Sequence, residues 1–131
     1  MDISKLGPVG AILGRIFVAV LFIVNGIGLI GNFGVVQGMM ETMGLPVASV
    51  LLTLTIVLQI GGGALILLGK WQAETAMIIA IWLIIATLVF HAPWAATPDT
   101  FDEQMIHFLK NIGLLGAMML LVATDRQNAA R

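Results

Sequence analysis

Cysteine is absent from this chain of 131 residues, and charged residues make up only 10% of it. Without cysteine the chain alone cannot form a disulfide, a thiolate metal site or a thiol redox centre. The formal net charge of −1 gives no basic field for binding nucleic acid. Motifs for flavin, haem, an iron–sulfur cluster or a nucleotide are also missing, and such cofactors usually carry redox chemistry. These absences argue against a nucleic-acid-binding protein and against a redox enzyme that works alone.

The few charges are spaced so that three long segments carry none. No formal charge lies between Arg15 and Glu41, between Glu41 and Lys70, or between Glu74 and Asp99. Each gap is about 24 to 28 residues long, and a membrane-spanning helix needs about 20 apolar residues. Hydrophobic residues make up 60% of the chain, against about 45–50% in soluble domains. We therefore expect an integral membrane protein.

The apolar segments predict an all-α membrane protein with a single domain over residues 1–131. Its four spans are expected at about residues 8–30, 46–69, 71–92 and 105–124. The first is expected to remain as a helix, because it is longer than the apolar part of a signal peptide. Pro46 would begin the second span and Gly69 would end it. The simplest fold is an antiparallel four-helix transmembrane bundle.

Two further patterns refine this fold. Valine and methionine recur at helical spacing within residues 32–44, which predicts a short interfacial helix between the first two spans. The motifs Gly10-xxx-Gly14 and Gly113-xxx-Ala117 fit close helix packing through small residues.

Basic residues gather on one side of the predicted spans. Five lie on the side that holds both termini and one lies on the other side: Lys5, Arg15, Lys70, Arg126 and Arg131 against Lys110. Because positively charged loops stay in the cytoplasm, both termini are expected there, in a multi-pass protein of the cell inner (cytoplasmic) membrane. Trp71 and Trp94 flank the third span and fit interface anchors.

Polar side chains interrupt the outer halves of the predicted spans. They are Asn25, Gln59, His91, His107, Lys110 and Asn111. The last three share one helical face through i, i+3, i+4 spacing. Unpaired polar groups in lipid cost several kcal/mol, so we expect these residues to turn inward and meet. Two interpretations stay open: hydrogen bonds that hold the helices together, or an outward-facing pocket for a small ligand or a quinone head group.

Ionisable side chains suggest two other arrangements. Arg15 and Glu74 are expected at the same depth near the cytoplasmic face, where an ion pair would make both tolerable. The alternative is that Arg15 reaches the lipid phosphates alone. Glu103, His107 and His91 are metal-ligand types, but their spacing is not specific, so no metal site is predicted.

Short motifs follow one another in a definite order from about Leu13 to Leu121. They are Leu13-Gly14-Arg15-Ile16, Phe22-Ile23-Val24-Asn25-Gly26, Met43-Gly44-Leu45-Pro46, the run from Gln59 to Gly69, His91 with Pro93-Trp94, and the run from Phe108 to Gly116. In this order and spacing the chain resembles the DoxX family of small four-span membrane proteins. The family often has ionisable residues where this chain has Asn25, Leu29 and Gln59. A hydrogen-bonding network would survive that exchange, whereas a proton-based role at these positions would not.

The resemblance implies that the protein is embedded in the membrane, but it does not imply a particular reaction. Some DoxX relatives are linked to quinone-reducing sulfur oxidation, and others to membrane complexes that handle oxidative and thiol stress. We therefore expect a non-catalytic accessory subunit of such a complex, without a cofactor of its own. It would contact membrane lipids, dock a protein partner or form a homo-oligomer, and bind a quinone or lipid in the outward-facing pocket. The alternatives are a quinone-linked oxidoreductase with its own activity and a small-molecule carrier formed by oligomers.

Overall fold

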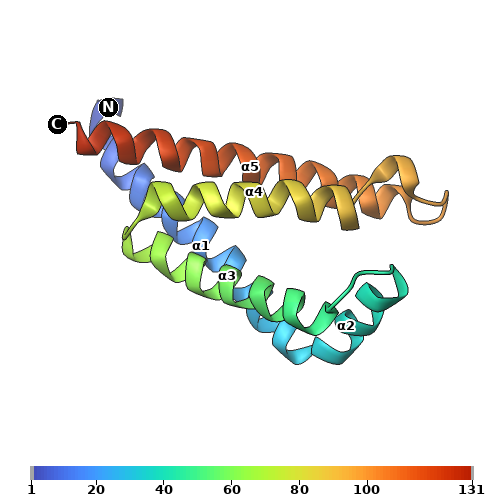
Figure 1. Cartoon of the computed structure of the whole chain (residues 1–131). Helices are drawn as coiled ribbons and strands as arrows, with labels where there is room; N and C mark the ends of the chain where they lie inside the picture. Colours follow the sequence, from blue (N-terminus) through green and yellow to red (C-terminus); the bar gives the residue numbers. More distant parts are fainter. Residues whose placement is uncertain (1, 131) are drawn as a thin grey trace. The chain divides into compact units, whose positions relative to one another are not determined.

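The computed structural model describes residues 2–130, most of which are helical (Figure 1). In chain order the elements are η1 (Ile3–Leu6), α1 (Gly7–Gly31), α2 (Phe33–Thr42), α3 (Ala48–Leu68), α4 (Gln72–Phe90), η2 (Pro93–Ala95) and α5 (Phe101–Ala129). Within the described range there is no strand. The chain divides into two compact units, residues 1–70 and 71–131. Arg131, which counts toward the predicted orientation, lies outside the described residues.

The four predicted spans are confirmed as helices. Segments long and apolar enough to cross a membrane are Ile3–Gly31, Ala48–Leu68, Gln72–Ala95 and Phe101–Ala129. The fourth extends past the predicted 105–124 at both ends. Hydropathy marks only the apolar part of a helix, whereas Asp102 in the first turn and Arg126 in the last complement the helix dipole and continue the helix beyond it. Helix α2 confirms the short helix between the first two spans.

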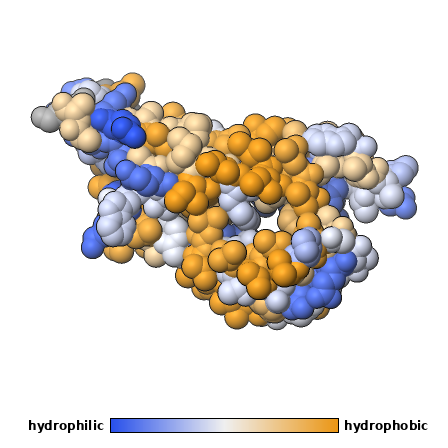
Figure 2. Space-filling view, in the orientation of Figure 1, coloured by the Kyte–Doolittle hydropathy of each residue, from blue (hydrophilic) through white to orange (hydrophobic). Residues whose placement is uncertain are grey.

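Apolar side chains cover much of the lateral surface of these helices, as Figure 2 shows. Phe17, Ile78 and Leu120 are 56–69% exposed. A soluble protein rarely shows so much apolar surface, but lipid tails are as apolar as leucine and cover it without penalty. The membrane-spanning helices therefore contact lipid.

In the first unit, α1 and α3 pack side by side in opposite directions (Figure 1). Gly63 of α3 faces Ala19 and Ile23 of α1, while Gly26 of α1 faces Ile60. A Cβ atom on Gly26 would stand 2.7 Å from Ile60 Cγ1, and one on Gly63 would stand 2.8 Å from Ile23 Cγ1. Only glycine therefore allows the two helices to approach this closely. Helix α2 packs mainly on α3.

The small-residue motifs predicted for close packing do not serve it within their own units. A Cβ added to Gly10, Gly14 or Gly113 meets no atom of another helix of its unit within 4 Å. The contact between α1 and α3 uses Gly26 and Gly63 instead.

Helix α3 ends as the sequence predicts. Gly69 adopts a left-handed backbone with φ +68°, a conformation that glycine takes without steric cost. Its N–H donates to the Ile66 carbonyl, and the Lys70 N–H donates to the Leu65 carbonyl. This pair of bonds is the Schellman motif, which satisfies the last carbonyl groups of a helix.

The start of α3 differs from the prediction. The helix begins at Ala48, because Pro46 lies in the preceding turn and Val47 takes a left-handed backbone with φ +47°. A β-branched residue rarely adopts this conformation, so nothing in the local sequence marked the boundary.

In the second unit, α4 and α5 also run in opposite directions (Figure 1). Gln72 Nε2 donates to the Leu121 carbonyl at one end, and His91 contacts Gln104 at the other. Ile79 and Met118 are fully buried. How the two units meet, and so whether all four spans form a single bundle, stays a prediction.

Candidate functional site

The six polar residues singled out in the sequence divide between the two units. Asn25 belongs to α1 and Gln59 to α3. In the second unit His91 caps the end of α4, and three residues lie on α5: His107, Lys110 and Asn111. Within the units three of the possible pairs are in contact: Asn25 with Gln59, His91 with His107, and His107 with Lys110. A single pocket that collects all six stays a prediction.

In the first unit, Asn25 and Gln59 pair directly. Asn25 Nδ2 donates to Gln59 Oε1 over 2.6 Å. Gln59 is buried, with 2% of its surface exposed, whereas Asn25 is exposed. Gly26, next to Asn25, lets the backbones approach closely enough for this bond. Because each side-chain amide has both donors and an acceptor, the pair can bind another polar group without any charge.

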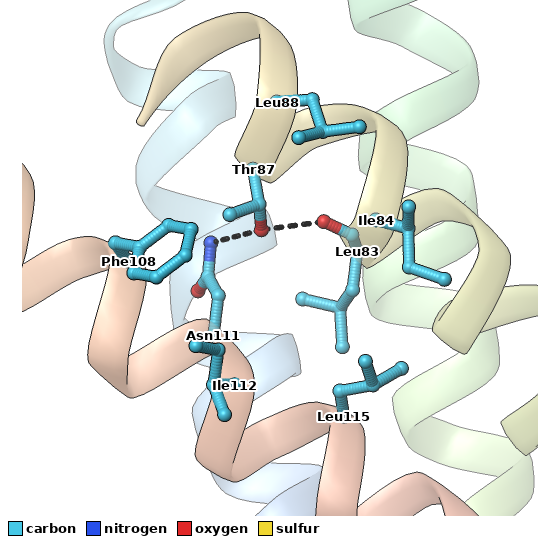
Figure 3. Close-up of a pocket in the computed structure, with 8 residues that line it drawn as sticks. All are labelled: Leu83, Ile84, Thr87, Leu88, Phe108, Asn111, Ile112 and Leu115. Atoms are coloured by element: carbon cyan, nitrogen blue, oxygen red, sulfur yellow. Dashed lines mark hydrogen bonds between the residues drawn. The ribbon is translucent and has the colours of Figure 1, made fainter. Parts of the chain in front are cut away.

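In the second unit, Asn111 and Thr87 form the corresponding pair (Figure 3). Asn111 Nδ2 donates to Thr87 Oγ1 over 3.0 Å, and Thr87 Oγ1 donates to the Leu83 carbonyl over 2.6 Å. All three residues are buried. Thr87 thus satisfies a carbonyl of its own helix and receives a bond from the next helix.

This pair forms part of the wall of a pocket between α4 and α5, called here the α4–α5 pocket. Its volume is about 160 Å³. Besides Thr87 and Asn111, it is lined by Leu83, Ile84, Leu88, Phe108, Ile112 and Leu115. Figure 3 shows the amide of Asn111 and the hydroxyl of Thr87 turned toward each other between these apolar side chains. The surface that the pocket presents is nonetheless almost wholly apolar.

His91 lies one turn beyond this pair, at the end of α4. Its Nδ1 stands 3.1 Å from Gln104 Oε1. Because an amide oxygen can only accept, His91 donates from Nδ1 in this contact.

His107 has two charged neighbours on its own helix. Lys110 Nζ stands 3.4 Å from His107 Nδ1, and Glu103 Oε1 lies 3.9 Å from His107 Nε2. The His91 and His107 rings stack with centroids 4.7 Å apart and planes 28° apart.

The described part of the chain contains no cluster of metal-ligating side chains. No group of three or more His, Asp or Glu side chains among residues 2–130 could hold a metal ion.

Arg15 lies against the end of α3. Its guanidinium occupies the space where a Cβ on Gly69 would stand. The carboxyl end of a helix carries partial negative charge, so a cation there is stabilising. Glu74 belongs to the second unit and is exposed; its ion pair with Arg15 stays a prediction.

Thr87 and Gln104 are site residues that the sequence reasoning missed. A threonine in an apolar helix satisfies itself through the carbonyl four residues earlier, so Thr87 did not stand out. A usable signal was present. If His91 and His107 face each other on antiparallel helices, the residues one turn further along the same faces must also face each other. These residues are Thr87, four before His91, and Asn111, four after His107.

Comparisons with known proteins agree with the resemblance seen in the sequence. The family model described as DoxX matches residues 10–92. The chain is similar to "Inner membrane protein YqjF" of Escherichia coli (strain K12), with 34% identity over 121 residues, 92% of this chain and 88% of that protein. It is also similar to "Inner membrane protein YphA" of the same organism, with 29% identity over 124 residues, 94% of this chain and 88% of that protein. No solved structure matches the chain.

Proposed function

Since the chain belongs to the DoxX family of membrane proteins, we propose that it is a non-catalytic accessory subunit of a membrane redox or stress-response complex. In this role it binds a quinone or a lipid in an outward-facing polar pocket. The observation that carries the proposal is the neutral Thr87–Asn111 pair, the polar part of a pocket wall that is otherwise apolar. An amide and a hydroxyl bind an oxygen-bearing ligand through hydrogen bonds but do not exchange protons at neutral pH. They suit binding better than catalysis.

The proposed location is the inner membrane, with both termini in the cytoplasm. Both E. coli relatives are named inner membrane proteins. In the topology predicted from the sequence, five of the six Lys and Arg residues lie on the side of the termini, and such residues favour the cytoplasm.

The proposed partner is another membrane protein or a second copy of this chain. Support comes from the small-residue faces that remain unfilled within each unit, at Gly10 and Gly14 on α1 and at Gly113 and Gly116 on α5. Faces of this type bring transmembrane helices into close contact.

The test is mass spectrometry of the full chain extracted with its surrounding membrane in polymer discs. We expect a co-purifying protein and a quinone or one enriched lipid. Asn111→Leu should lose the small molecule, whereas Ile81→Leu, on an exposed α4 position outside the pocket, should retain it. Finding neither a partner nor an enriched small molecule would overturn the proposal.

A further inference from the structure

We propose that the stacked rings of His91 and His107 form a pH-sensitive contact, called here the histidine latch, at the loop end of the second unit. The latch stays closed while at most one ring is protonated, and it opens when both rings carry a charge. Opening parts the end of α4 from the first turns of α5. This inference goes beyond the proposed function, because it concerns regulation of the fold and requires neither a ligand nor a partner.

The geometry of the latch brings two titratable groups into direct contact. The ring centroids are 4.7 Å apart and the ring planes differ by 28°. Histidine changes its charge between about pH 5 and pH 8. Two unit charges 4.7 Å apart repel by roughly the equivalent of a tenfold change in an equilibrium, a value between the limits for bulk water and for a protein surface. The stacked arrangement is therefore disfavoured once both rings are protonated.

The charged neighbours of the latch add to this repulsion. Lys110 Nζ stands 3.4 Å from His107 Nδ1, and a protonated ring has no nitrogen left to accept a hydrogen bond from the ammonium. Glu103 Oε1 lies 3.9 Å from His107 Nε2. His107, Lys110 and Glu103 are also the charged groups of the described chain that act on His91. The other carboxylates of this end are exposed: Asp99 and Asp102. With both rings protonated, three positive charges thus face the one carboxylate of Glu103.

The packing next to the latch offers little resistance to opening. Besides the stack, a hydrogen bond of 3.1 Å joins His91 to Gln104, and Trp94 makes an edge contact with Phe108, with ring centroids 5.8 Å apart. Beginning one turn deeper, the half-open α4–α5 pocket of about 160 Å³ interrupts the contact between the two helices. Segments with few buried apolar contacts open at low free-energy cost. Repulsion between the rings is therefore enough to separate the helix ends.

The test measures the distance between these helix ends at two pH values. The chain has no cysteine, so Val89→Cys and Ile106→Cys, at two exposed positions, place one spin label on each helix near the latch. The full chain is studied in phosphatidylcholine nanodiscs by double electron–electron resonance. We expect one short distance at about pH 8, and at about pH 5 a longer distance whose population relative to the short one has risen about tenfold.

Two kinds of control separate the latch from general effects of acid. Ile78→Cys on α4 and Leu120→Cys on α5, also at exposed positions, label the opposite end of the same helices and should report the same distance at both pH values. In the chain labelled near the latch, His107→Phe keeps an aromatic ring in the stack but cannot be charged, so it should stay closed at about pH 5. His91→Gln should stay closed as well. Both variants keep every carboxylate of the chain.

Each outcome decides the proposal. Opening in the parent that both histidine variants lose supports the latch, whereas an unchanged distance in the parent overturns it. Opening that persists in His107→Phe and His91→Gln would assign the effect to carboxylates and overturn the latch. Equal lengthening at the opposite end would show general unfolding and overturn it too. Circular dichroism shows whether each variant folds, and if His107→Phe does not, His91→Gln decides.

Discussion

Asn25 and Gln59 show how single residues make a polar group acceptable inside a membrane. Both side chains are neutral, and a 2.6 Å hydrogen bond joins them across α1 and α3. The DoxX family often has ionisable residues at both positions, so the pair replaces charge with an amide contact. The sequence predicted that such a network would survive the exchange, and the structure confirms the contact within this unit.

We predict that the Asn25–Gln59 bond contributes modestly to stability. In a double-mutant cycle with Asn25→Leu and Gln59→Leu, the coupling free energy should be about 0.6 kcal/mol and at most about 1.7 kcal/mol, the range for polar contacts between transmembrane helices. The measurement is unfolding of the purified protein by sodium dodecyl sulfate in mixed micelles.

The matched control for this cycle pairs Gln59→Leu with Asn32→Leu. Asn32 bonds the Gly28 carbonyl of its own helix, so its coupling to Gln59 should be zero within error. Equal coupling in both cycles would show that the direct bond contributes nothing.

The candidate site could be predicted in part at the residue scale. Asn111, His91 and His107 stood out because polar groups are rare in apolar helices. Their partners Thr87 and Gln104 did not stand out. A threonine can bond its hydroxyl to a carbonyl of its own helix, and Gln104 lies where hydropathy predicts a loop. Pairing depends on the register between helices, which one helix's sequence does not contain.

At the scale of elements, the end of α3 couples two helices. Gly69 stops α3 in a left-handed conformation, and Arg15 from α1 fills the space beside it. One glycine therefore serves both the end of its own helix and the packing of its neighbour. The stop was predictable, because glycine there is a standard helix end; the role of Arg15 was not, because it depends on contact across 54 residues of chain.

We predict that Gly69→Ala destabilises the protein by more than about 1–2 kcal/mol. The left-handed backbone alone costs about that much for a residue with a Cβ, and the new methyl group must also displace Arg15. Gly61→Ala is the control, because Gly61 is inside α3 with no atom of its unit near the added Cβ. It should stabilise by about 0.5–1 kcal/mol.

Detergent-induced unfolding of both variants gives these free energies. With Arg15→Ala in the background, the cost of Gly69→Ala should fall to the backbone part alone. If the cost of Gly69→Ala is the same with and without Arg15, the contact between the two residues has no energetic role.

At the scale of the whole molecule, hydropathy predicted the membrane spans. Hydropathy located all four spans because each is apolar over about 20 residues, and the structure confirms them as helices. The contacts between spans could not be predicted in the same way. Apolar side chains such as leucine and isoleucine suit contact with lipid as well as contact with a neighbouring helix. An apolar pattern therefore does not show which face of a span packs against another helix.

We predict that the turn at Lys70 faces the cytoplasm and the loop at Asp99 faces outward. The chain has no cysteine, so a single Lys70→Cys or Asp99→Cys supplies a unique label site. A membrane-impermeant maleimide should label Asp99→Cys on intact cells and Lys70→Cys only after the membrane is opened. The unsubstituted chain is the blank. The reverse pattern of labelling would invert the proposed orientation.

The separate polar contacts of the two units have a consequence for synthesis at the ribosome. The Asn25–Gln59 bond needs only residues 1–70, and the Thr87–Asn111 and Gln72–Leu121 bonds need only residues 71–131. The first hairpin can therefore leave the insertion machinery with its amides already paired, before the second hairpin has been translated. Each half can then enter the bilayer with its own polar contacts already made, so neither half has to wait for the other before its amide groups are satisfied.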